Sequence, residues 1–365
     1  MPRAAQRERG DRCVCNNLSP MQIGIDSFVS TVTDPGTGAV ISPVERVHHL
    51  LEEVERADQV GLDTYGIGEH HRREFMDSAP AVLLAAAAAR TSTIRLNSAV
   101  TVLSAADPVR VFQEFATVDL ISRGRVDLVV GRGSFVESFP LFGLDLADYD
   151  SLFAEKLDLL LRIREQKEVT WSGRHRPPLT GQGVFPRPLQ NPLPIWVGVG
   201  GTPESFVRAG TLGLPLMVAI IGGQPARFRP LVDLYREAGR RAGHPPEELQ
   251  VGLHCIGFVG NTTHEAADDF YPGWAQMFGT IGRERGFRPP DRAQYDPMCA
   301  PDGAYLIGDP ESVATKILRI NDDLGGISRI ALQMTNVRLG HESLLHAIEV
   351  LGTEVAPVVR DAAPG

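Results

Sequence analysis

The chain has 365 residues, a hydrophobic content of 43% and a formal net charge of -9 at pH 7. The negative charge, with no long run of Lys and Arg, argues against a nucleic-acid partner. No apolar run reaches the roughly 20 residues that cross a bilayer. Among the four cysteines only Cys13 and Cys15 are close in sequence, which argues against a metal site and indicates a reduced, cytoplasmic protein.

The two ends of the chain differ from the part between them. Residues 1–20 lack the apolar core of a secretory signal and are predicted to form a disordered tail. Residues 21–356 are expected to form one domain, and residues 357–365 a short C-terminal tail.

Segments with strand character alternate with segments of helical periodicity. Asp107 and Pro108 are typical of the start of a helix, as N-cap and first helical residue, and Ser78 is predicted to cap another. The predicted strands are Met21–Phe28, Thr64–Gly68, Ile94–Leu103, Arg125–Val130, Ile195–Val199, Leu214–Ile221, Gln250–Val259 and Ile327–Met334. The predicted helices lie at about 43–60, 78–90, 108–122, 149–164, 204 onward, up to 243, 264–277, 310–324 and 342–355.

Strands that alternate with helices pair in parallel through right-handed crossovers, so eight such units predict an α/β fold, the (β/α)8 TIM barrel. Two stretches break the rhythm. Gln166–Pro194 is rich in proline and is predicted to be a hairpin or lid over one end of the barrel. Gly279–Ala304 is predicted to be an irregular insertion. A doubly wound sheet is disfavoured because no G-x-G-x-x-G follows the first strand.

Glu69, His70 and His71 follow the second predicted strand, where α/β barrels place their chemistry. A metal-dependent hydrolase would need ligands from several strand ends. The two histidines are adjacent, so they point to opposite sides of an extended backbone. A glycosidase would need two facing carboxylates, and only Glu69 is suitably placed. A hydrogen-bonded pair of histidines at the barrel rim is the structural alternative.

Two turns suit an anion. Gly131–Ser134 follows the fourth strand and offers Arg132 for a bidentate contact. Gly200, Gly201 and Thr202 follow the fifth strand and lead into a helix whose N-terminus favours negative charge. Both segments can equally be plain turns, with Arg132 paired to a neighbouring carboxylate such as Glu137 and with Ser134 and Thr202 as helix caps.

Several segments together resemble the bacterial-luciferase-like flavin-dependent oxidoreductases, over about residues 21–355. These segments are EHH after the second strand, TVLSAADPVR after the third, LISRGRVDLVVGRGS, and VGVGGTPES. The resemblance is to FMN-type, stand-alone members of unknown substrate. It implies a (β/α)8 barrel that holds the flavin ring in its mouth.

The resemblance also implies roles for individual residues. His70 corresponds to the catalytic histidine of the family. Glu69 is expected either to support it by fixing its tautomer or to cap the loop, while His71 is expected to be structural. A non-prolyl cis peptide bond is implied between Ala99 and Val100, under the flavin ring. The cofactor-binding positions implied or predicted are Ala99, Val100, Thr101, Gly131, Arg132, Tyr149, Gly200, Gly201 and Thr202. Tyr149 replaces a family arginine that would fall near Asp150.

The predicted function is a flavin-dependent monooxygenase that uses reduced FMN and O2 to oxygenate a small apolar organic substrate. Reduced flavin would come from a separate NAD(P)H:flavin reductase, because no nicotinamide motif is visible. A deazaflavin-dependent reductase or dehydrogenase is one alternative, and a non-catalytic flavin-binding protein is another. The resemblance further implies a homodimer, with the Ala-rich helix Ala79–Arg90 as a candidate contact. No membrane or nucleic-acid partner is expected, from the charge and hydropathy given above.

Overall fold

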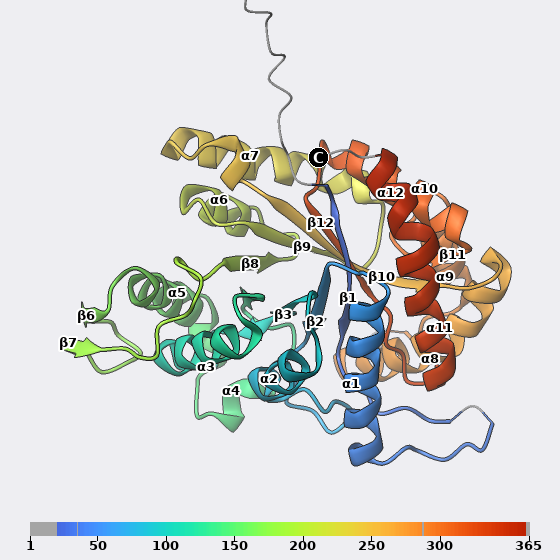
Figure 1. Cartoon of the computed structure of the whole chain (residues 1–365), viewed down its shortest axis with the longest axis horizontal. Helices are drawn as coiled ribbons and strands as arrows, with labels where there is room; N and C mark the ends of the chain where they lie inside the picture. Colours follow the sequence, from blue (N-terminus) through green and yellow to red (C-terminus); the bar gives the residue numbers. More distant parts are fainter. Residues whose placement is uncertain (1–19, 35, 287, 363–365) are drawn as a thin grey trace, which may run out of the picture.

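The computed structural model describes residues 20–34, 36–286 and 288–362 (Figure 1). Within these residues eight parallel strands close into a barrel in the order β1, β2, β3, β5, β8, β9, β10 and β12, and β12 pairs with β1. Their bounds are β1 (Gln22–Ser27), β2 (Thr64–Ile67), β3 (Arg95–Ser98), β5 (Val126–Gly131), β8 (Ile195–Val199), β9 (Leu216–Ile220), β10 (Val251–Val259) and β12 (Arg329–Gln333). The predicted (β/α)8 barrel is confirmed.

Helices surround the barrel (Figure 1). They are α1 (Pro43–Gln59), α2 (Pro80–Arg90), α3 (Pro108–Ser122), α4 (Ser138–Leu141), α5 (Tyr149–Glu165), α6 (Pro203–Thr211), α7 (Arg229–Ala242), α8 (Thr263–Arg285), α9 (Arg292–Cys299), α10 (Pro310–Leu324), α11 (His341–Val350) and α12 (Ala356–Ala362). Short strands β4 (Thr101–Val102) and β11 (Leu306–Gly308) add to β5 and β10.

Local sequence explains where several helices begin. The Asp107 carboxylate accepts hydrogen bonds from the backbone N–H groups of Val109 and Arg110, and Pro108 is the first residue of α3, as predicted. The prediction for α2 is wrong in its cap, because Ala79 is the N-cap and makes no side-chain hydrogen bond. Pro80 at the first position supplies the start instead.

The insertion predicted over Gly279–Ala304 is not irregular, and this prediction is wrong. Helix α8 continues to Arg285, past the expected end near Met277, and α9 occupies Arg292–Cys299. The Asp291 carboxylate accepts a hydrogen bond from the Gln294 N–H and begins α9. The glycines and prolines of this stretch therefore lie within or between two helices and do not form a long loop.

The insertion predicted over Gln166–Pro194 contains an antiparallel hairpin, β6 (Glu168–Trp171) and β7 (Leu179–Gly183). It lies beside α5, away from the barrel centre (Figure 1). Its tip contacts the starts of two helices, through Arg176 to Asp107 and His175 to Ser151. The hairpin prediction is confirmed, but the lid prediction is wrong, since no residue of 166–194 lines the barrel cavity described below.

A charged group fills the amino end of the barrel. The Asp127 carboxylate, fully buried, accepts hydrogen bonds from Arg95 and from Nη2 of Arg329 at 2.7 Å. The Arg329 guanidinium lies over the Trp196 ring at 4.4 Å. Burial works to raise the pKa of Asp127, but the two guanidinium groups outweigh it and the pKa is lowered. This end is closed by paired charge, so the open cavity lies at the other end.

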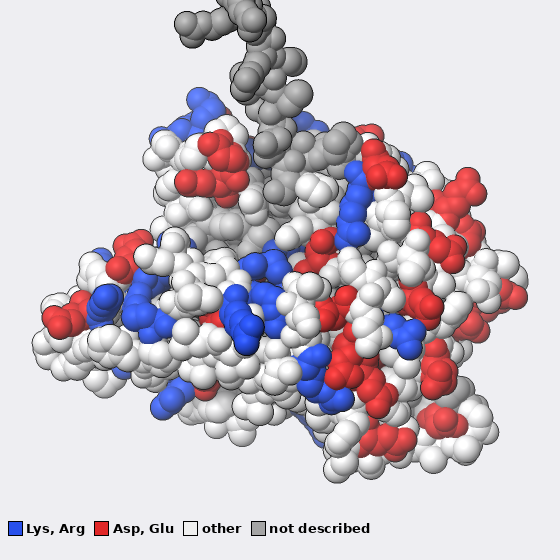
Figure 2. All heavy atoms as spheres, in the orientation of Figure 1, with Lys and Arg blue, Asp and Glu red and all other residues white. Residues whose placement is uncertain are grey.

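The last described residues do not form a tail from 357, because α12 continues to Ala362 and buries Val359. The predicted tail over 1–20 lies almost wholly outside the described residues, as do Cys13 and Cys15. Cys255 and Cys299 are free thiols. No helix in the described part of the chain has the length and apolar character of a membrane span. On the face seen in Figure 2, Lys and Arg are scattered among Asp and Glu without a continuous basic area.

Candidate functional site

A cavity of about 360 Å³ opens at the carboxyl ends of the barrel strands. This volume falls within the roughly 300–1,000 Å³ of small-molecule sites. Seven of the eight barrel strands, or the loops that follow them, contribute lining residues, among them Asp26, His70, Ala99, Gly131, Gly200, Met217 and His254. The cavity therefore gathers residues that lie more than 200 positions apart in sequence.

His70 lines the cavity and is held by Asp77. Nδ1 of His70 lies 2.8 Å from Oδ2 of Asp77, and the His70 backbone N–H donates to Oδ1 of the same carboxylate at 3.1 Å. Phe28 and Phe75 pack on the imidazole at ring-centroid distances of 4.6 and 4.5 Å. Burial raises the pKa of Asp77, and the hydrogen bond from His70 acts in the opposite direction. The ring of His70 is thus fixed on one edge by a buried carboxylate.

Glu69 does not support His70, so this expectation is wrong. Oε1 of Glu69 lies 3.0 Å from Nε2 of His71, and Oε2 accepts the backbone N–H of Val102 at 2.8 Å. Glu69 therefore links the loop after β2 to the start of β4. His71 pairs with this carboxylate and still belongs to the cavity wall. The partner that sequence reasoning missed, Asp77, lies seven residues after His70 in the loop between β2 and α2, where no helical or strand period applies.

Arg132 lies where two predicted anion turns meet. Its Nη2 is 3.5 Å from Oγ1 of Thr202 and 3.4 Å from Oγ of Ser205, at the beginning of α6. Its Nη1 donates to Oδ1 of Asp150 at 2.6 Å, so Arg132 does pair with a carboxylate, but the partner is Asp150 and not Glu137. Glu137 pairs instead with Arg72 at 2.6 Å. The structure thus brings the GRGS turn and the GGT turn together.

Tyr149 stands next to Arg132, whose guanidinium lies 5.2 Å from the centre of the phenol ring. The hydroxyl of Tyr149 donates its hydrogen to the carbonyl oxygen of Gly133 at 2.6 Å. Burial raises the pKa of this phenol. The hydroxyl is therefore engaged with the GRGS turn, which it holds in place.

The second turn leaves open space in front of its backbone. A Cβ atom built at Gly200 or at Gly201 would meet no heavy atom within 4 Å. Thr202 is the N-cap of α6 but its side chain makes no capping hydrogen bond to the helix. Gly200 and Thr202 line the cavity, whereas Gly201 does not. The positive end of α6, with Arg132 beside it, is therefore open to a ligand and favours negative charge.

The peptide bond between Ala99 and Val100 is cis, as the resemblance implied. Both residues line the cavity, whereas the next residue, Thr101, is buried and does not line it. A Cβ at Gly131 or Gly198 would stand 2.6 or 2.7 Å from a methyl carbon of Val100. These two glycines make room for Val100, which is a packing reason that sequence reasoning did not find for Gly131.

His254 and Asp26 form a second histidine–carboxylate pair in the same cavity, and sequence reasoning assigned neither a role. Nδ1 of His254, in the middle of β10, lies 2.6 Å from Oδ2 of Asp26 in β1. Both residues line the cavity. A lone histidine within an apolar strand gives no local signal, and only closure of the barrel brings these residues together.

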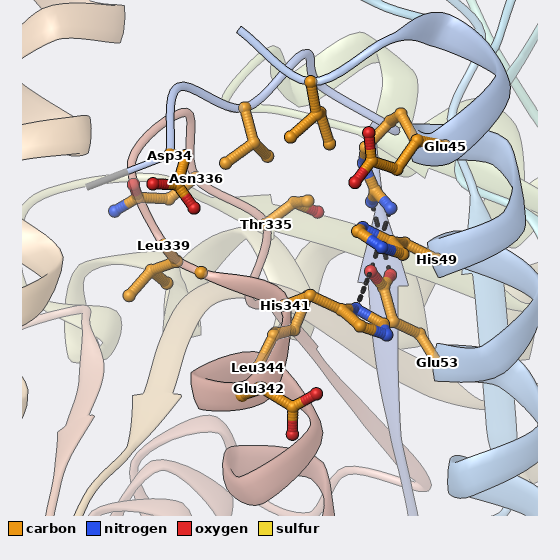
Figure 3. Close-up of a pocket in the computed structure, with 14 residues that line it drawn as sticks. Asp34, Glu45, His49, Glu53, Thr335, Asn336, Leu339, His341, Glu342 and Leu344 are labelled. Carbon is orange, nitrogen blue, oxygen red and sulfur yellow. Dashed lines mark hydrogen bonds and ion pairs between the residues drawn. The ribbon is translucent and has the colours of Figure 1, made fainter. Parts of the chain in front are cut away.

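A smaller cavity, about 330 Å³, lies outside the barrel between the loop after β1 and the start of α11 (Figure 3). The rings of His49 and His341 stack there at 3.8 Å, almost parallel. The buried Glu53 carboxylate below them pairs with Arg46 at 2.9 Å. In the described residues no group of three or more His, Cys, Asp or Glu side chains is arranged to hold a metal ion.

Comparison with known proteins agrees with this geometry. The family model described as luciferase-like monooxygenase matches residues 21–326. An uncharacterized protein, y4vJ, of Sinorhizobium fredii is 34% identical over 338 residues, which cover 86% of this chain and 92% of that protein. The chain therefore belongs to the luciferase-like monooxygenase family, an enzyme family, as the sequence motifs indicated.

Two solved structures share the fold. One is the oxygenating constituent of 3,6-diketocamphane monooxygenase of Pseudomonas putida in complex with FMN, with a TM-score of 0.72 and 21% identity over 93% of this chain and 98% of that one. The other is an F420-dependent secondary alcohol dehydrogenase, with a TM-score of 0.70 and 20% identity over 93% of this chain and 99% of that one. At this identity the likeness concerns the barrel alone.

Proposed function

As a member of the luciferase-like monooxygenase family, this chain is, we propose, a flavin-dependent monooxygenase that uses reduced FMN and O2 to oxygenate a small, mainly apolar organic substrate. One observation carries the proposal. A single cavity has an anion site at Arg132 and the start of α6, and a carboxylate-held imidazole, His70, in its wall. The barrel, residues 21–356, is proposed as the one functional unit.

The anion site fits the phosphate of FMN. Arg132 and the hydroxyls of Thr202 and Ser205 are close together, and the backbone at Gly200 and Gly201 is open to a ligand. The ion pair with Asp150 does not block this role. The Asp150 side chain is 73% exposed, and an exposed pair of this kind contributes only about 0–1 kcal/mol. A phosphate can therefore replace Asp150 as the partner of the Arg132 guanidinium.

The wall next to the anion site fits a flat ring. Ala99 and Val100 present backbone and small side chains, and the glycines in β5 and β8 keep the adjacent strands close to Val100. We place the isoalloxazine ring of FMN on this wall. Bound reduced FMN would supply the electrons with which O2 is activated.

His70 is the proposed proton-handling residue. A carboxylate can only accept a hydrogen bond, so Asp77 in its ionised form fixes the hydrogen of His70 on Nδ1. Nε2 is then the atom that takes or returns a proton. The rings of Phe28 and Phe135 stand beside the imidazole at 4.6 and 5.4 Å, and they keep water from this edge of the cavity.

The remaining walls support an apolar substrate. Met217 and Ile221 from β9 and its following loop, together with Phe28 and Phe135, give the cavity a mainly hydrocarbon surface. Phe139, a residue of α4, is fully buried and does not line the cavity.

We further propose that reduced flavin comes from a separate NAD(P)H:flavin reductase, that the enzyme is cytoplasmic, and that it forms a homodimer. The first point is supported by the end of β1 and the residues that follow it, DSFVST, which have none of the glycines of a dinucleotide-binding turn. Light scattering of the purified protein tests the dimer.

The experiment that tests the function compares cofactors directly. Purified protein is titrated with FMN, anaerobically reduced FMN and the deazaflavin F420, and binding is followed by fluorescence quenching. We expect micromolar binding of FMN or reduced FMN, and O2 uptake only when a flavin reductase and NADH are both added. Tighter binding of F420 would favour the reductase alternative. Binding without any turnover that depends on His70 would favour a non-catalytic flavin carrier.

A further inference from the structure

Asp26 and His254 form a hydrogen-bonded carboxylate–imidazole pair like the one formed by Asp77 and His70. Its Nδ1–Oδ2 distance is 2.6 Å, and the Phe28 ring stacks on His254 at 5.7 Å with an interplanar angle of 18°. Phe28 also contacts His70, so it separates two histidines of similar design. The function proposed above uses only one of them.

The neighbouring strand leaves space for Asp26. A Cβ atom at Gly66 in β2 would stand 1.9 Å from Oδ1 of Asp26, so any larger residue at position 66 would displace the carboxylate. This oxygen is buried, and no atom of the described residues forms a hydrogen bond with it. Removing a carboxylate from water is unfavourable unless the charge is used or paired. His254 provides the pairing on one oxygen only.

The position of His254 relative to the proposed flavin wall follows from the strand order. In the ring of eight barrel strands, β10 is four places from β3 in either direction, so His254 faces the Ala99–Val100 wall across the barrel. A molecule that lies between the two walls would have the flavin side at one face and His254 at the other.

The hydrogen-bond chemistry of His254 selects the kind of group that it can bind. The Asp26 carboxylate accepts the hydrogen on Nδ1, so a neutral ring has a lone pair on Nε2. Among the described residues no partner bonds to Nε2, and the His254 side chain is 12% exposed, at the cavity wall. Nε2 therefore accepts a hydrogen bond, and a hydroxyl group can donate one whereas a ketone or an ether cannot.

We propose that His254, positioned by Asp26, binds a weakly acidic hydroxyl group of the organic substrate, a phenol or an enol, and takes its proton. The O–H bond breaks, its electron pair stays on the substrate oxygen, and the proton bonds to Nε2. The imidazolium that results is balanced by Asp26. A phenol, with a pKa of ~10 in tyrosine, is acidic enough for such a transfer, and an ordinary alcohol is not.

This inference rests on the proposed function, because it names the substrate class of the same cavity, but its test does not require turnover. The probes are 4-hydroxyacetophenone and 2-naphthol, whose near-ultraviolet absorbance distinguishes the protonated from the ionised form. Their methyl ethers are the matched controls. Each is titrated into the full-length protein, with and without FMN, at a pH at which the free phenol is mostly protonated.

We expect both phenols to bind more tightly than their methyl ethers, and the ionised fraction of bound phenol to rise roughly tenfold, which is one unit of pKa. His254→Gln should abolish the ionised signal. Asp26→Asn should reduce ionisation more than binding, because an amide still orients the ring but cannot balance the imidazolium. His264→Gln is the control, since that side chain is 89% exposed, and it should behave as the wild type.

Three outcomes would overturn the inference. The first is equal binding of the phenols and their methyl ethers. The second is no binding of either phenol. The third is an ionised signal that survives in His254→Gln and disappears in His70→Gln. The wild-type comparison of phenol with ether decides the question even where a variant fails to fold, which circular dichroism reports. An FMN titration of the same sample is read separately, so failure of the flavin proposal and failure of this one are distinguishable.

Discussion

Nδ1 of His70 lies 2.8 Å from Oδ2 of Asp77, a carboxylate that has no exposed surface. This pair makes a test of the proton-handling role possible. Asp77→Asn leaves the ring packed but removes the charge that stabilises the imidazolium. We expect turnover with a flavin reductase to fall roughly 10²–10⁴-fold in His70→Ala, the range of general acid–base catalysis, and to fall in Asp77→Asn as well. FMN binding should change little in both.

The matched control for that experiment is Glu69→Gln. Its carboxylate is hydrogen-bonded to His71 and to the Val102 N–H, not to the His70 ring. Turnover in this variant should fall much less than in Asp77→Asn. An equal loss in the two variants would mean that the loop after β2, and not the His70–Asp77 bond, determines the rate.

Arg132 and Asp150 should affect FMN affinity in opposite directions. Hydrogen bonds to charged groups contribute roughly 1.5–3 kcal/mol, so Arg132→Ala should weaken FMN binding by about 10- to 100-fold. Asp150→Asn removes a carboxylate that competes with phosphate for Nη1, and should strengthen binding a few-fold at low salt. Fluorescence titration measures both. A loss of affinity in Asp150→Asn would place the phosphate elsewhere.

Substitutions at two glycines of one segment should affect different properties, one the stability of the fold and the other the affinity for FMN. In Gly198→Ala the new methyl would stand 2.7 Å from Cγ1 of Val100, and overpacking of this kind costs about 1–3 kcal/mol. In Gly200→Ala nothing lies within 4 Å, so thermal stability should hold while FMN affinity falls. Val100→Ala should restore the stability of Gly198→Ala. If it does not, the clash is not the cause.

The charged group at the amino end of the barrel should dominate acid unfolding. The lowered pKa of Asp127 stabilises the fold above the unfolded-state value of ~3.9, and this contribution is lost as the pH falls through the folded-state value. Asp127→Asn leaves Arg329 and Arg95 without their shared carboxylate, and the loss of one partner of a buried pair costs about 3–5 kcal/mol. Urea unfolding between pH 3 and pH 7 should show a lower stability and a flatter acid limb.

The stacked histidines of Figure 3 should give a pH dependence near neutrality. Burial alone would lower the pKa of His341, but the Glu53 carboxylate, 3.7 Å from Nδ1, and the Glu52 carboxylate, hydrogen-bonded to Nε2, outweigh it and the pKa is raised. The stability that this provides is present below the unfolded-state value of ~6.5 and is lost as the pH rises through the folded-state value. His341→Gln should therefore destabilise the protein more at pH 5.5 than at pH 8.

His49 provides the contrast. Burial, then the neighbouring His341, lowers its pKa, so protonation in the unfolded state disfavours folding as the pH falls below ~6.5. His49→Gln should lessen the loss of stability on the acid side. Chemical denaturation at the two pH values measures both variants, and a parallel shift in both would contradict the assignment.

The sequence predicted the barrel well because each of its strands is a short apolar segment whose period and flanking turns are local properties. β8 was predicted with the correct ends, and β1 and β10 within one or two residues. The third predicted strand, 94–103, is interrupted by the cis bond and becomes β3 and β4. Only the family resemblance, and no local pattern, indicated that interruption.

The lid prediction failed because the hairpin runs along α5 from the amino face, and its tip ends against Asp107 and Ser151 without lining the cavity. The insertion at 166–194 joins the end of α5 to the start of β8, so both of its ends are anchored at the amino face of the barrel. The cavity lies at the carboxyl face, which is built from loops that join strand ends to helix starts. Proline content and length cannot tell the two kinds of loop apart, but their place in the strand–helix order can.

The site was predicted in part. Arg132, Thr202 and His70 come from turns with local signals, and the structure gathers them in or beside one cavity. Asp77 and His254 have no such signal, since their importance lies in contacts set by the fold. Asp26 and His254 are 228 residues apart, and only the strands β1, β12 and β10, paired in that order, bring them together.

Trp196 gives the enzyme an optical reporter of its own. The indole packs with Val129 and Met217, two residues of the cavity wall, above the Arg329 guanidinium. A flavin in that cavity would lie within a few side chains of the indole, close enough for efficient energy transfer. The ultraviolet emission of unlabelled protein therefore offers a direct signal of cofactor arrival, and Trp196→Phe identifies the share that comes from this ring.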